Sequence, residues 1–228
     1  MARVLKTTDR VSQFAEKSLK NKKEFGEDAR LAFKRHLNDL KRSEKNDPSF
    51  PYVFVPEKAE DIIELANKLT IAEGEGDQEF TCAGFQEFIL GSLFGWVHKE
   101  TGKRRFTDSY VQVARQQGKS VLNAILGIKC SNFDNYNYGQ IYCTATKSDQ
   151  ARIVLNEISK FINADADLQE LFDIKDYKSE ITGKITNTVI RALGRDTKSI
   201  DGFRPYLGIV DEYHAHKDNQ MYKLLKGG

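Results

Sequence analysis

One short segment of the sequence carries the residue types that bind a phosphate group. It ends in Gly118, Lys119 and Ser120, after an apolar stretch and before a pattern typical of a helix. A phosphate loop needs backbone N–H groups around an anion, a lysine for the β- and γ-phosphate oxygens and a hydroxyl for Mg²⁺. The standard eight-residue motif begins with a glycine, whereas Val113 stands at that position here. The segment therefore predicts a nucleotide-binding loop of unusual form.

A second signal is an apolar stretch, residues 206–210, that ends in Asp211 and Glu212. The tip of a strand beside a phosphate loop lets Asp211 hold Mg²⁺, directly or through water. Glu212 would then polarise the attacking water as a general base. The alternative is a strand that simply leaves the core, but the order of loop and strand along the chain favours function. Together the two signals predict hydrolysis of the β–γ bond by positioning and charge neutralisation.

Other polar residues near these signals allow two interpretations each. The guanidinium group of Arg115, inside the loop, would reach the γ-phosphate or form an ordinary salt bridge. His214 and His216, with Asp218, offer imidazoles two residues apart but no further pattern of zinc ligands. We therefore expect a structural or sensor role for these histidines beside the acidic pair.

The elements that must position these residues follow from the hydrophobic pattern. Strands are expected at 108–114, 139–145, 185–192 and 206–210, and helices at 59–69, 85–97, 121–128 and 150–163, with a loop at 73–77. From residue 106 onward strands alternate with helices. This alternation predicts an α/β fold with a doubly wound, mostly parallel sheet, whose ligands bind at the carboxyl ends of the strands.

The first 47 residues differ from the rest of the chain in charge. They contain 13 lysines and arginines and 8 acids, and their apolar residues recur at helical spacing. One or two helices are expected, ending at 46–48. We predict a charged helical arm over 1–47 that packs on a nucleotide-binding domain over 48–228. An arm that faces DNA is the alternative.

Composition limits the remaining possibilities. The 228 residues carry 35 Lys and Arg against 33 Asp and Glu, a formal net charge of +2, which excludes a histone-like polycation. Three cysteines are too few for a disulfide scaffold. Because no apolar stretch is long enough to span a bilayer, the sequence predicts a soluble intracellular protein.

Three segments carry a family resemblance. The Arg-Gln-Gln-Gly-Lys-Ser loop, the Asp-Gly-Phe-Arg-Pro run at 201–205 and the Val-Asp-Glu-Tyr-His-Ala-His-Lys-Asp run at 210–218 resemble the ATPase domain of phage large terminases, especially the HK97-type group. The resemblance covers about residues 50–228, and the Asp-Glu-aromatic-His-Ala-His part is the most specific. It implies a P-loop NTPase core of the ASCE type with an N-terminal helical extension.

The resemblance also implies an activity, cofactors and partners. A domain of this kind would use ATP and Mg²⁺ to translocate double-stranded DNA into a procapsid. Its partners would be double-stranded DNA, bound weakly and without sequence preference, the portal protein and the small terminase subunit. The motor would be a homo-oligomeric ring, located in the host cytoplasm and docked transiently on the procapsid.

Individual residues take roles from the same resemblance. Gln86 matches the position at which the family reads adenine, and its amide suits the N6/N7 edge; an ordinary helix-surface glutamine is the alternative. An arginine finger is a guanidinium group that one subunit supplies to the nucleotide of its neighbour. The candidates for this role are Arg191, Arg195 and Arg204, and the sequence does not choose among them. The expected nucleotide contacts are Gln86, Arg115, Gln116, Gln117, Gly118, Lys119, Ser120 and Val121, the catalytic residues Glu212, Arg115 and Lys119, and the metal ligands Ser120 and Asp211.

Two other functions remain open at this stage. Asp211-Glu212-Tyr213-His214 also reads as the DExH box of a helicase-like ATPase, although the loop lacks the usual Gly-x-Gly-Lys-Thr form. The sequence ends soon after the acidic pair, before the coupling motif and the nuclease domain of full-length terminases. We therefore expect an N-terminal fragment, for which a non-catalytic nucleotide-binding or docking module is the second alternative.

Overall fold

The computed structural model describes residues 9–21, 23–72, 76, 78–146, 148–193 and 204–227. The chain divides into two compact units, one formed by Met1–Lys68 with Phe80–Gln112 and the other by Leu69–Glu79 with Val113–Gly228. These units have other bounds than the expected arm over 1–47 and nucleotide-binding domain over 48–228. That functional division stays a prediction.

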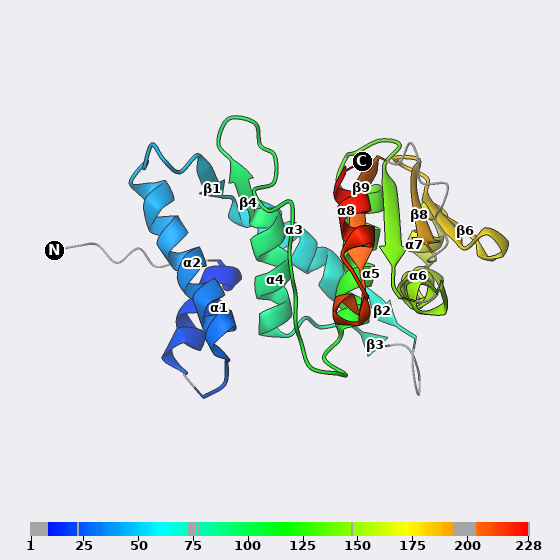
Figure 1. The fold of residues 1–228 in the computed structure, drawn as a ribbon, viewed down its shortest axis with the longest axis horizontal. Helices are drawn as coiled ribbons and strands as arrows, with labels where there is room; N and C mark the ends of the chain where they lie inside the picture. Colours follow the sequence, from blue (N-terminus) through cyan, green and yellow to red (C-terminus); the bar gives the residue numbers. More distant parts are fainter. Residues whose placement is uncertain are drawn as a thin grey trace. The chain divides into compact units, whose positions relative to one another are not determined.

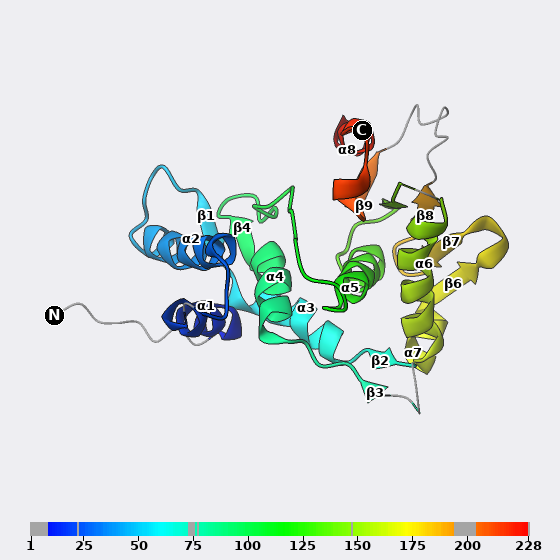
Figure 2. The same ribbon diagram turned by 60° about the horizontal axis from the view of Figure 1, so that its bottom comes forward.

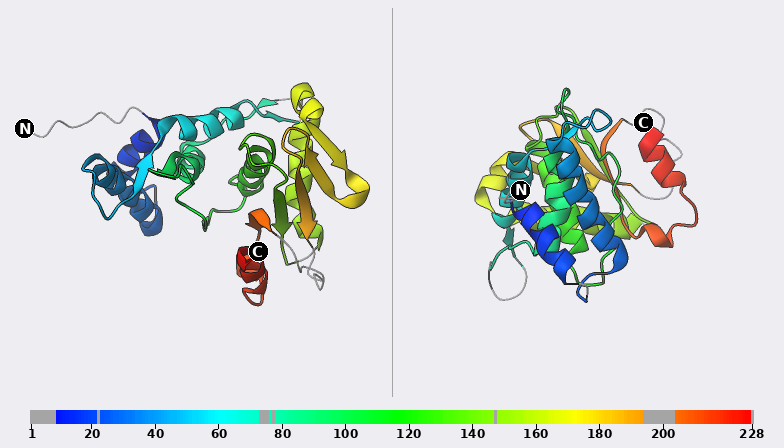
Figure 3. Two further views of the ribbon diagram at one scale, coloured as in Figure 1. Left: turned by 90° about the horizontal axis from the view of Figure 1, so that it is seen from above. Right: turned by 90° about the vertical axis from the view of Figure 1, so that its left-hand side faces the viewer.

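The first unit is mainly helical. Two helices form within the charged N-terminal segment, as expected: Asp9 caps the first by accepting from the Ser12 amide at 2.8 Å, and the second stops before Asn46, whose φ is 49°. The first helix packs against both the second and α4 (Figure 3). A short antiparallel pair, β1 with β4, completes the unit. Its elements are α1 (Arg10–Lys20), α2 (Glu27–Glu44), β1 (Tyr52–Phe54), α3 (Pro56–Asn67), α4 (Gly84–Gly95) and β4 (Trp96–His98).

The second unit is built around a five-stranded sheet with the order β6-β7-β8-β5-β9. Strand β5 lies between β8 and β9 and is parallel to both, whereas β7 is antiparallel to its two neighbours. Helices α5 and α6 pack on one another and on β8. The unit contains β2 (Thr70–Ile71), β3 (Gln78–Glu79), α5 (Lys119–Asn132), β5 (Gln140–Thr144), α6 (Ser148–Asn163), α7 (Ala166–Leu171), β6 (Phe172–Lys175), η1 (Asp176–Lys178), β7 (Glu180–Gly183), β8 (Thr188–Leu193), β9 (Pro205–Val210), η2 (Tyr213–Ala215) and α8 (Gln220–Gly227) (Figure 1).

An α/β fold is confirmed, but the sheet is mixed rather than mostly parallel. The expected strands at 139–145, 185–192 and 206–210 exist as β5, β8 and β9, with β8 beginning at Thr188. The hairpin of β6 and β7, at the opposite edge of the sheet from β9, was not expected (Figure 2). Its strands have only four residues each, too few to show a clear alternation.

The strand expected at 108–114 is wrong. These residues belong to no strand, and most of their side chains are exposed, Tyr110 at 70%. Only Val111 and Val113 among them are half-buried along the chain that leads to the loop. A β-branched pattern favours a strand only where a partner strand and a packing surface are available, and propensity alone supplies neither.

Two further expectations concern the loop at 73–77 and membrane-spanning segments. Most of the loop expected at 73–77 lies outside the described residues. Among the residues that the structure describes, every helix is too short or too polar to span a bilayer.

Candidate nucleotide-binding site

The turn over residues 115–118 leads directly into α5. Gln116 and Gly118 both have left-handed backbones, with φ of 62° and 73°. Glycine adopts this conformation without a steric cost, and alternation of right- and left-handed residues turns successive N–H groups toward a common centre. Among the described residues, no side chain caps the N-terminus of α5. Its first amide groups are therefore available to an anion, which the helix dipole also attracts.

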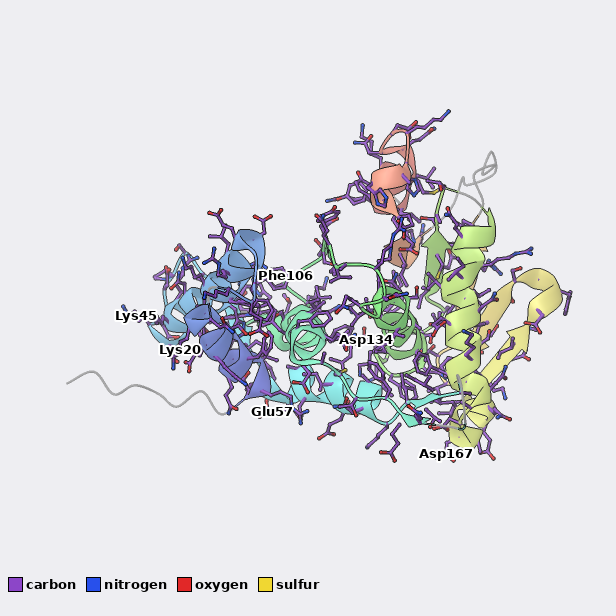
Figure 4. The ribbon with its side chains drawn as sticks, turned by 90° about the horizontal axis from the view of Figure 1, so that it is seen from below. Lys20, Lys45, Glu57, Phe106, Asp134 and Asp167 are labelled. Carbon is purple, nitrogen blue, oxygen red and sulfur yellow. The ribbon has the colours of Figure 1, made fainter. Side chains whose placement is uncertain are left out.

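Contacts at both ends hold α5 against β9. The two elements pack on one another. Beyond the C-terminal end of α5, Asp134, labelled in Figure 4, accepts a hydrogen bond from the Tyr206 hydroxyl at the start of β9. At the opposite ends, Nζ of Lys119, the first residue of α5, lies 3.1 Å from Oδ1 of Asp211, the residue after β9.

The tip of β9 presents the two acids in different environments. Asp211 is buried, and its amide donates to the Thr144 carbonyl at 2.8 Å, which extends the pairing of β9 with β5 by one residue. Glu212 has a left-handed backbone, φ 48°, and its amide donates to Asp211 Oδ1 at 2.9 Å. The chain thus turns sharply after Asp211, and this turn aims the half-exposed Glu212 carboxylate at α5.

Lys119 meets both acids. Its Nζ lies 3.1 Å from Asp211 Oδ1 and forms an ion pair with Glu212 Oε1. Desolvation acts to lower the pKa of Lys119, but hydrogen bonds to Glu212 and Asp211 outweigh it and raise that pKa above its usual value. The hydrogen bond from Lys119 lowers the pKa of Glu212 against the effect of desolvation, and the charges of His214 and Arg115 lower it further. The site is therefore a compact cluster of opposite charges.

The structure thus brings together residues 119, 211 and 212, which sequence reasoning placed in one site. The remaining residues expected to bind phosphate form the turn before Lys119 or the first helical turn after it. Arg115 is exposed and acts electrostatically on Glu212. The full set in this region is Arg115, Gln116, Gln117, Gly118, Ser120 and Val121.

Gln86 belongs to the first unit, where it lies in the first turn of α4. It is buried, and its Oε1 accepts a hydrogen bond from the Ala83 amide at 2.9 Å. This contact satisfies an amide group at the helix N-terminus, a role that the sequence pattern did not reveal. The contact of Gln86 with adenine stays a prediction.

The three arginines expected as candidate arginine fingers are Arg191, Arg195 and Arg204. Arg191, on β8, donates to Glu180 at 2.8 Å. Arg204 precedes β9, and its amide donates to the Gln140 side chain at 3.3 Å. Arg195 lies outside the described residues. Their action on a neighbouring subunit stays a prediction.

The two histidines after the acidic pair contact that pair. His214 Nδ1 lies 3.4 Å from Glu212 Oε2, and His216 Nε2 lies 3.3 Å from the Asp211 carbonyl oxygen. Asp218 instead accepts from the Gln220 amide at the start of α8. Within the described part of the chain, no three His, Cys, Asp or Glu side chains are grouped as metal ligands would be. Sequence spacing placed the histidines near the site but did not predict these partners.

The mixed sheet and its packed helices define an α/β protein. The loop before α5 and the cluster of Lys119, Asp211 and Glu212 form its candidate site. A family model, described as the terminase large subunit, ATPase domain, matches residues 84–228. The chain belongs to this family. The terminase large subunit of Enterobacteria phage HK97 is 31% identical over 105 residues, which are 45% of this chain and 20% of that protein.

A solved structure gives the same fold. The crystal structure of the HK97 bacteriophage large terminase matches with a TM-score of 0.65 and 22% identity, over 75% of this chain and 34% of that chain. The chain therefore spans about a fifth of the curated relative and about a third of the solved one.

Proposed function

We propose that this domain binds ATP with Mg²⁺ at the loop before α5 and hydrolyses it. The observation that carries this proposal is the convergence of Lys119, at the start of α5, with Asp211 and Glu212, at the tip of β9. A cation at a helix N-terminus attracts phosphate, and two carboxylates within reach of it supply a metal ligand and a base. Family membership independently supports a nucleotide-using ATPase domain.

Each residue has a part in the proposed reaction. Lys119 and the amide groups of the turn hold the phosphates, and Arg115 adds charge at the γ-phosphate. Mg²⁺, when bound, neutralises phosphate charge. The donor set fits it, since the Ser120 hydroxyl and the Asp211 carboxylate are the hard oxygen ligands that this ion prefers. Glu212 accepts a proton from the attacking water.

The wider role follows from the relatives. We infer a P-loop core of the ASCE type with an N-terminal helical extension, acting as the ATPase of a viral packaging motor. In that role the domain drives double-stranded DNA into a procapsid in the host cytoplasm, as one member of a ring that contacts the portal protein and the small terminase subunit. The names of the relatives, both large terminases, support this role.

The experiment is a comparison of ATP hydrolysis by the wild-type chain, Glu212→Gln and Asp173→Asn. Glutamine keeps the shape of Glu212 but accepts no proton, so we expect hydrolysis to fall by roughly 10²–10⁴-fold. Asp173→Asn, which changes an exposed carboxylate on β6, should hydrolyse as the wild type does. Normal hydrolysis by Glu212→Gln would contradict the base assignment. Nucleotide binding without wild-type hydrolysis would instead support the non-catalytic module.

A further inference from the structure

The lysine proposed to bind phosphate is already engaged by protein carboxylates. An ammonium group has three N–H donors and no acceptor. The ammonium group of Lys119 contacts two carboxylates at once: Asp211 Oδ1 lies 3.1 Å from Nζ, and Glu212 Oε1 forms an ion pair with it. The lysine and Glu212 are each 34% exposed, so the contact is open to an entering ligand. One positive charge thus faces two negative charges.

The turn after β9 fixes Glu212 in this position. The left-handed backbone of Glu212 is unusual for a residue with a side chain, and two hydrogen bonds maintain it. Its amide donates to Asp211 Oδ1, and its carbonyl accepts from the Ala215 amide at 2.8 Å. His214 lies against the second carboxylate oxygen. Both oxygens of Glu212 therefore have partners within the protein.

We propose that the Lys119–Glu212 ion pair, hereafter the lock, competes with nucleotide phosphate for Lys119. This inference rests on the proposed function. The ammonium group of Lys119 already faces two carboxylates, so phosphate would bring a third anion to one positive charge, and its repulsion of Glu212 weakens the ion pair. Phosphate that reaches Lys119 therefore displaces Glu212. The displaced carboxylate is then free to accept a proton, so that the base becomes available only when nucleotide occupies the loop.

The first test needs no nucleotide. The ε-amine of Lys119 is acylated with an N-hydroxysuccinimide ester, and the modified peptide is quantified by mass spectrometry. Breaking the ion pair in Glu212→Gln, and equally in Glu212→Ala, should increase the acylation rate of Lys119 by about 1.5- to fivefold, the range expected for loss of one partly exposed ion pair. The matched control is Asp173→Asn, whose partner Lys175 lies 3.1 Å away. It should leave Lys119 unchanged.

The second test is equilibrium binding of the non-hydrolysable analogue AMP-PNP with Mg²⁺. We expect Glu212→Gln to bind it about 1.5- to fivefold more tightly than the wild type. In the Lys119→Ala background the same substitution should have no effect, because the lock no longer exists. A gain of equal size in that background would mean that Glu212 repels phosphate without the lysine, and would overturn the lock.

The outcomes separate the two claims. If the wild type binds AMP-PNP and Lys119→Ala does not, while Glu212→Gln changes neither acylation nor affinity, the lock is refuted and the nucleotide site stands. If acylation increases in Glu212→Gln but every variant fails to bind AMP-PNP, the ion pair exists and the proposed function fails.

Discussion

His36 is a buried polar residue whose protonation state can be assigned from its neighbours. The Trp96 indole, which is only a donor, donates to His36 Nδ1 at 3.0 Å. His36 Nε2 therefore carries the ring proton and donates to the Ser12 hydroxyl at 2.9 Å. This direction leaves Ser12 without a base, so the pair is structural. Burial lowers the pKa of His36 to about 4, since a charged ring would lose water and face the indole N–H.

The first prediction concerns acid stability. The folded pKa of about 4 lies below the usual 6.5, so the unfolded state binds more protons between these values. Stability should be complete above pH 6.5 and should fall as the pH decreases toward 4, by roughly 3 kcal/mol in total. Urea unfolding followed by fluorescence of Trp96, the single tryptophan, measures this in the first unit.

The matched variant for this measurement is His36→Gln. Its amide oxygen can accept from Trp96 but does not titrate in this range, so its stability should decrease less steeply with falling pH. Equal slopes for the two proteins between pH 6.5 and 4 would show that His36 is not the group responsible.

For the cluster of Lys119, Asp211 and Glu212, the sequence predicted the members better than their contacts. Lys119, Asp211 and Glu212 were recognisable because each residue type sits at the end of a patterned segment. The ion pair between Lys119 and Glu212 was not, since it depends on the left-handed turn at Glu212. The sequence gives no sign of this turn, because glutamate rarely adopts a left-handed backbone.

At the scale of elements, α4 packs closely because it carries glycines on its inner face. A Cβ placed on Gly91 would lie 2.4 Å from Val11 Cγ2 of α1 and 3.3 Å from Ala59 Cβ of α3. Gly95 is similarly covered by Phe54 of β1. The backbone of α4 thus approaches both neighbouring helices without room for a methyl group.

The second prediction is that Gly91→Ala destabilises the protein. Overpacking costs roughly 1–3 kcal/mol, which exceeds the gain of up to about 1 kcal/mol in helix propensity. Chemical unfolding followed by circular dichroism measures the difference. Gly227→Ala in α8, where nothing lies within 4 Å of the new Cβ, is the control and should not be destabilised. Destabilisation of equal size at both positions would rule out packing as the cause.

Elements with a long, regular hydrophobic pattern were predictable from the sequence. Short strands, and a segment that has strand-like composition but no neighbouring strand, were not. The predicted helices at 121–128 and 150–163 correspond to α5 and α6, whose apolar residues recur over several turns. The β6–β7 hairpin has strands of four residues and was missed. Residues 108–114 have a strand-like composition but pair with no strand in the described part of the chain. Tertiary context decides such cases.

At the scale of the whole molecule, the match of the family model begins at Gly84, the first residue of α4. It therefore includes α4 of the first unit together with the loop, sheet and acidic pair of the second. The sequence indicated the family because its most specific segments, the loop and the acidic strand tip, are local. It did not indicate the two compact units, since the first unit joins residues far apart in the chain.

The central claim, that ATP phosphate binds at the loop before α5, is tested most directly by the affinity of AMP-PNP with Mg²⁺ for the wild type, Lys119→Ala and Lys175→Ala. Loss of a charge-assisted contact costs about 1.5–3 kcal/mol, so Lys119→Ala should bind roughly ten- to more than a hundredfold more weakly. Lys175→Ala, which changes a half-exposed lysine on β6, should bind as the wild type does. Wild-type affinity in a folded Lys119→Ala protein would contradict the account.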